Sequence, residues 1–233
     1  MNKRPYLLLL VITFLCILVT LLMPPTAQWA SYHHFADERH VWGISNFWNV
    51  VSNAPFFLIG VFGFFKLRWA WMAGEFSGWH EVVPFALIFF GLVLTAIGSS
   101  YYHLAPDNYR LLWDRIPMTL VFTAFVSLVV MERVNFKVGI RLLLPLVLFG
   151  VWSAWYWYWT ESLGQGDLRF YGFVKIYSLI AVLLILYLFP KPYPSTKLIL
   201  GLIAFYAMAT FFEFADEKVF EMGEVVSGHT LKH

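Results

Sequence analysis

Residues 82–103 read VVPFALIFFGLVLTAIGSSYYH, an apolar run that ends in hydroxyl, phenol and imidazole groups. An apolar run of about 20 residues is long enough to cross the hydrocarbon core of a bilayer as a helix. An ionisable group in or beside such a helix is unfavourable unless it has a partner or a function. The stretch therefore predicts a transmembrane helix that brings Ser99 and His103 to a site at the membrane boundary.

Similar apolar runs recur at about 5–23, 46–65, 115–131, 138–159, 170–189 and 196–214. An eighth segment begins near Val225 and stops at His233, which is too short to cross. The chain is 60% hydrophobic and 13% charged, whereas a soluble domain is about a quarter charged. We expect an all-α integral membrane protein: a seven-helix bundle over 32–233, its last helix apparently truncated, preceded by one extra N-terminal transmembrane helix within 1–31. The first run is long for a signal peptide, and we interpret it as a retained helix.

The distribution of Lys and Arg predicts the orientation. With the N-terminus in the cytoplasm, nine basic residues fall inside and seven outside, which agrees with the positive-inside rule. His103, Asp114, Asp216 and His229 then all fall near the outer side, where scattered polar residues would not have to converge. The chain suits a bacterial inner membrane or an internal eukaryotic one, and we take the bacterial inner membrane as our expectation. Its net charge of +2 is too small to indicate nucleic acid binding, and its oligomeric state is left open.

His229 and His233 are four residues apart, so on a helix they share a face and lie about 6 Å from each other. Two imidazoles at that spacing can bind one metal ion. The alternative is that they cap a helix or extend to the membrane interface, as the adjacent Lys232 would suggest. Cys16 is the only cysteine, so neither a disulfide within the chain nor a cysteine-rich zinc site is possible.

Ser99 and His103 repeat the same spacing, so His103 could supply a third nitrogen from another helix. Three protein ligands and a water make a catalytic zinc site, although imidazole also suits copper, iron and nickel. Ser99 could instead serve small-residue helix packing.

Asp114 could act as a general base near metal-activated water. It could equally pair with Arg115 or stabilise a helix N-terminus. Glu213 and Asp216 could orient a histidine, or simply be solvated at a helix end. The oxygen-rich residues Asp37, Glu38, Asn46, Asn49 and Asn53 could hold calcium, or form a polar approach to a span with an aromatic belt.

Taken together, these residues resemble the alkaline ceramidase family, within the superfamily that includes the progestin and adiponectin receptors. The resemblance rests on four stretches, which are Asn46–Asn53, Ser99–His103, Asp114, and Ser227–His233. It implies a seven-helix membrane fold with zinc inside the bundle, bound by His103, His229 and His233. It also implies that Asp114 handles protons and that Ser99 lies by the metal and the developing oxyanion. The family's calcium site ends in Glu where this chain has Asn46, so the pattern disfavours calcium.

We therefore expect a zinc-dependent intramembrane hydrolase that cleaves the amide bond of ceramide or a related N-acyl lipid. The alternative is a non-enzymatic lipid-binding or receptor-like protein in which zinc is a structural clamp. A transporter with a proton relay would need ionisable residues deep in several spans. The spans are apolar there, apart from Glu213 and, near span ends, Arg141 and Lys175.

Overall fold

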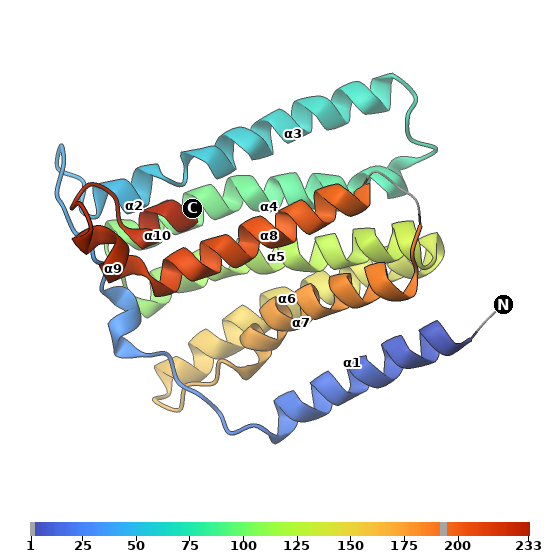
Figure 1. The fold of residues 1–233 in the computed structure, drawn as a ribbon, viewed down its shortest axis with the longest axis horizontal. Coiled ribbons are helices and arrows are strands. Elements are labelled where there is room, and N and C mark those ends of the chain that lie inside the picture. The colour runs from blue at the N-terminus through green and yellow to red at the C-terminus, as the bar shows by residue number, and fades with distance from the viewer. Residues whose placement is uncertain (1–2, 192–194) are drawn as a thin grey trace.

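The computed structural model of the chain describes residues 3–191 and 195–233. Over these residues it is helical, and seven segments are long and apolar enough to cross a membrane. They are α1 (Arg4–Leu22), α2 with α3 (Phe47–Val51 and Ala54–Met72), α4 (Trp79–Leu104), α5 (Asn108–Arg133), α6 (Phe136–Ser162), α7 (Arg169–Leu188) and α8 (Ser195–Phe214). Three short helices, η1 (Ala30–His33), α9 (Asp216–Glu221) and α10 (Gly228–Lys232), complete the fold (Figure 1). The predicted all-α, multi-pass membrane architecture with an additional N-terminal helix is confirmed, whereas the domain boundary at 31/32 stays a prediction.

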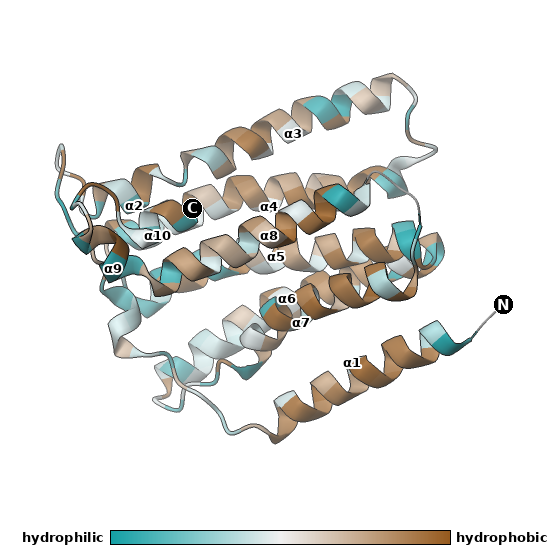
Figure 2. Ribbon diagram, viewed as in Figure 1, coloured by the Kyte–Doolittle hydropathy of each residue, from teal (hydrophilic) through white to brown (hydrophobic). Residues whose placement is uncertain are grey.

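Helix α5 is the centre of the bundle. It packs against α4, α6 and α7. More than half of the residues in its most apolar stretch are buried inside the protein. Helix α1 has no buried residue and lies along α7 (Figure 1). Most other helices present apolar surfaces outward, and much of their ribbon is brown in Figure 2. Such surfaces suit lipid rather than water as the surrounding solvent.

Two predicted spans have different bounds in the structure. The second extends to Met72 and is broken between α2 and α3, where the Asn53 amide donates to the Asn49 carbonyl and Pro55 follows. The fourth begins at Asn108 rather than 115, because the Asp107 carboxylate caps the helix by accepting from the Arg110 N–H at 2.7 Å. Asp114 and Arg115 consequently lie inside α5 and not at its start.

The ends of the elements that carry the predicted site gather at one end of the bundle. There α4 ends, α5 begins, and α2, α9 and α10 lie close together, opposite the end at which α1 begins (Figure 1). Hydrophilic segments appear in teal at this end of the bundle, as they also do at the opposite end (Figure 2). The predicted convergence of residues from distant parts of the sequence on one end is thus present in the fold.

Candidate metal centre

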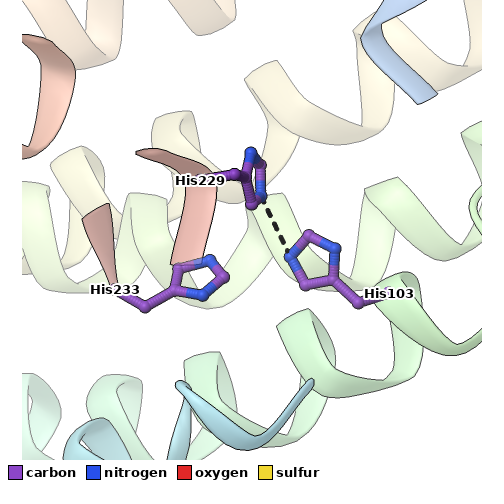
Figure 3. A group of neighbouring side chains, drawn as sticks. All are labelled: His103, His229 and His233. Carbon is purple, nitrogen blue, oxygen red and sulfur yellow. Dashed lines mark hydrogen bonds between the residues drawn. The ribbon is translucent and has the colours of Figure 1, made fainter. Parts of the chain in front are cut away.

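Three imidazoles meet between α4 and α10. His103 comes from the last turn of α4, and His229 and His233 come from α10 and the residue that follows it (Figure 3). One ring nitrogen of each lies within 4.8 Å of the others. His103 and His229 are buried and His233 is half-buried. The residues predicted from two distant stretches of sequence therefore form one cluster.

The donor set fits a metal ion such as zinc. The Nε2 atoms of His103 and His229 are 3.3 Å apart, close to the separation of roughly 3.3 Å expected for two tetrahedral zinc ligands with bonds of about 2.0–2.1 Å. The Nδ1 atom of His103 is buried without a hydrogen-bond partner among the described residues. Burial, assisted by the charge of Lys232, lowers the pKa of His229. This favours the neutral imidazole, which is the form that binds metals.

Helix α10 is only five residues long, so contacts with other elements fix its position. The Asp216 carboxylate accepts from the backbone N–H of His229 at 2.7 Å and from that of Ala36 at 2.9 Å. Gly228 allows the close approach, since a Cβ at this position would lie 2.3 Å from the Phe212 carbonyl oxygen. Asp216 therefore positions the backbone of a candidate ligand, and not its imidazole ring as the sequence-based hypothesis proposes.

Polar groups on α2 and beside it orient the histidines. The Ser52 hydroxyl is hydrogen-bonded to Nδ1 of His233 at 2.8 Å, which leaves Nε2 of that ring for the cluster. The Asn46 amide donates to the His103 carbonyl, and the Thr230 hydroxyl donates to the Asn49 side chain, both at 2.8 Å. This orienting role is not predicted from the sequence. The available signal was the clustering of Asn and Ser at the start of an apolar span.

Ser99 and Asp114 face each other across α4 and α5. The Ser99 hydroxyl is hydrogen-bonded to the Asp114 carboxylate, and Ser99 is 2% exposed. Gly98 permits this contact, because a Cβ there would lie 2.2 Å from the Trp113 carbonyl oxygen. The two alternatives for Asp114 are not supported, since the first turn of α5 contains no acid and Arg115 donates to Gln28 instead.

A cavity of about 250 Å³ opens beside the cluster. Its lining includes Ser99, Asp114 and His233. Apolar side chains from three helices line much of the remainder, namely Leu92, Met118, Val121, Phe122 and Ala209. The cavity thus joins the polar cluster to a surface that an alkyl chain could contact.

An ion pair also borders the cavity. The Nζ atom of Lys232 lies 3.0 Å from Oε1 of Glu213. The Tyr32 hydroxyl donates to the same carboxylate oxygen at 3.4 Å. Although burial alone would lower the pKa of Lys232, the Glu213 carboxylate raises it above the ordinary value. Lys232 therefore points into the protein rather than toward the membrane interface.

In the oxygen-rich segment where calcium is one candidate, Asp37 is paired with an arginine. The Arg39 guanidinium donates to both carboxylate oxygens of Asp37, at 2.8 and 2.5 Å. It also donates to the carbonyl oxygens of Glu224 and Val225 at 3.2 and 2.8 Å. Arg39 therefore supplies the positive charge at Asp37 and ties the segment before α2 to the loop before α10.

Comparison with known proteins identifies the family. A family model described as Ceramidase matches residues 37–218. The match covers most of the chain, so the chain belongs to the Ceramidase family, as the resemblance predicted. The matched range contains Ser99, His103 and Asp114, whereas His229 and His233 follow it. No similar protein was found among curated sequences or among solved structures.

Proposed function

We propose that this protein is a zinc-dependent intramembrane amidohydrolase that cleaves the amide bond of ceramide or a related N-acyl lipid. Membership of the Ceramidase family supports an amidohydrolase with a lipid substrate. The observation that carries the proposal is the triad of imidazole nitrogens within 4.8 Å of one another. One of the three histidines, His233, lines the same largely apolar cavity as Ser99 and Asp114.

His103, His229 and His233 would hold the metal. A zinc ion bound there would act as a Lewis acid toward the amide carbonyl and lower the pKa of water to about 7. The apolar residues Leu92, Met118 and Phe122 would contact the acyl chain, and so orient the amide toward Ser99 and Asp114. This arrangement requires the amide to enter the cavity with its carbonyl toward the histidines.

Asp114 would take a proton from the water that attacks the amide carbon. When the carbon–nitrogen bond breaks, it would give that proton to the departing amine, as general acid–base catalysis requires. The Ser99 hydroxyl donates to Asp114 in the resting state. Once Asp114 is protonated, that hydroxyl would be free to donate to the developing oxyanion. The hydrogen bond therefore couples the two roles.

Metal analysis combined with release of free fatty acid from a panel of N-acyl lipids tests the proposal. We expect about one zinc ion per wild-type chain and measurable release. H103A should lose zinc and activity together, whereas D114N should keep zinc and lose roughly 100-fold or more in rate. H80A is the matched control, because His80 is exposed at the other end of α4.

Substantial activity in purified H103A would remove that residue from the site. Zinc binding without release from any N-acyl lipid would favour the receptor-like alternative, in which the metal is a structural clamp.

A further inference from the structure

The cavity beside the candidate metal centre is lined by more cations than carboxylates. Arg115, Lys175 and Lys232 line it together with Asp114 and Glu213. Glu213 is already paired with Lys232 at 3.0 Å. Even with Asp114 ionised, the described lining has one positive charge in excess. An uncompensated charge among membrane helices is unfavourable, so the excess requires an explanation.

Among the described residues, neither Lys175 nor Arg115 forms an ion pair with a carboxylate. Lys175 projects into the cavity from α7, where its Nζ lies 5.9 Å from the centre of the Tyr171 ring. Within the described residues, no carboxylate oxygen lies within 4.0 Å of this amine. A lysine that faces a cavity in this way is available to a ligand.

Arg115 has unused donors in the same cavity wall. It is 4% exposed, and its Nε and Nη1 atoms are buried without a hydrogen-bond partner in the part of the chain described. The central carbon of its guanidinium, Cζ, lies 3.9 Å from the centre of the Trp157 ring and 4.6 Å from the centre of the Tyr171 ring. Lys175 and Arg115 are therefore both close to the Tyr171 ring. Planar guanidinium donors that are left unpaired favour a carboxylate partner.

We propose that Arg115 and Lys175 form a subsite for the carboxylate of a lipid ligand. A carboxylate would accept from both side chains and balance the excess charge, whereas an alcohol of equal chain length would not balance it. The source of the carboxylate rests on the proposed function. It is either the fatty acid that amide cleavage releases or an acidic head group on the substrate, as in an N-acyl amino acid.

The test compares binding of palmitate and hexadecanol to the full chain in phosphatidylcholine nanodiscs. Treatment with a chelator removes metal, so that the carboxylate has no metal to bind. We expect wild-type protein to prefer palmitate by about tenfold or more, as one charge-assisted contact would give. K175M should remove this preference and K175R should retain it. K66M is the matched control, since Lys66 is exposed on α3.

The ratio of the affinity for palmitate to the affinity for hexadecanol is measured within each variant. A partial loss of folded protein therefore does not change this ratio. A ratio near one in wild-type protein, or an unchanged ratio in K175M, would overturn the subsite. A ratio that depends on Lys175 supports it, even if no N-acyl lipid is hydrolysed and the proposed function fails.

Turnover by the metal-loaded protein identifies the source of the carboxylate. Faster hydrolysis of N-palmitoylglycine than of N-palmitoylethanolamine, with the preference lost in K175M, assigns the subsite to the head group. In the alternative outcome, the protein hydrolyses the two substrates at equal rates, and palmitate inhibits K175M less than wild-type protein. That result assigns the subsite to the released fatty acid.

Discussion

Ser52 shows how one hydroxyl can determine which nitrogen of a histidine faces the other imidazoles of a cluster. Its hydrogen bond to Nδ1 of His233 fixes the orientation of a half-buried ring whose backbone follows the short helix α10. Contacts of this kind hold the ligand ring in place, and their removal typically weakens metal binding without unfolding the protein.

We predict that S52A binds zinc roughly 10- to 100-fold more weakly than wild-type protein, because His233 loses the partner that orients its ring. Competition with a chelator of known affinity measures the effect. S162A is the control, since the Ser162 hydroxyl donates to the carbonyl of Trp159 in its own helix, far along the sequence from the candidate ligands. Equal zinc affinity in S52A and S162A would show that Ser52 does not orient a ligand.

The packing of α4 on α5 determines the relation between Ser99 and Asp114. The two helices are in close contact where Gly98 faces the backbone of Trp113 and Asp114. Glycine is needed at this position because the nearest atoms belong to the backbone of α5, which cannot rotate away as a side chain could. The spacing between hydroxyl and carboxylate is thus a property of helix packing.

G98A should therefore destabilise the protein by about 1–3 kcal/mol, the usual effect of overpacking, and should lower activity by separating Ser99 from Asp114. Thermal unfolding in detergent and fatty acid release measure the two effects. G201A is the matched control, because a Cβ at Gly201 of α8 meets no atom within 4 Å. It should be neutral or stabilising by up to about 1 kcal/mol. Similar behaviour of the two variants would contradict the packing argument.

Part of the candidate site can be predicted from the sequence alone, and the rest cannot. The spacing of Ser99 with His103 and of His229 with His233 follows from helical geometry, so it could be predicted locally. The contacts of Ser52 with His233, of Asp216 with Ala36, and of Lys232 with Glu213 depend on how separate helices pack. The sequence predicts the start of α5 too late, because Asp114 and Arg115 resemble a polar boundary, although both lie within the helix.

At the scale of the whole molecule, the bundle has two distinct ends. The loop between α3 and α4 lies at the same end as the start of α1, and the candidate site lies at the other (Figure 1). The excess of Lys and Arg at the first end leads us to propose that it faces the cytoplasm, with the site on the outer side of a bacterial inner membrane.

Labelling with a membrane-impermeant maleimide tests this orientation. In a C16S background, a cysteine at exposed Glu38 should react in intact cells, whereas one at exposed Glu75 should react only after the membrane is permeabilised. Glu38 lies near the site and Glu75 lies between α3 and α4. The opposite pattern would reverse the proposed topology.

The separation of His103 from His229 has a consequence for biogenesis. The two residues contact each other through Nε2, yet helices α5 to α8 lie between them in the chain. No intermediate in which α8 is still outside the bilayer can bring these nitrogens together. If the protein has the proposed function, metal capture would therefore be a late event of membrane assembly, and a half-inserted chain would not hydrolyse lipids.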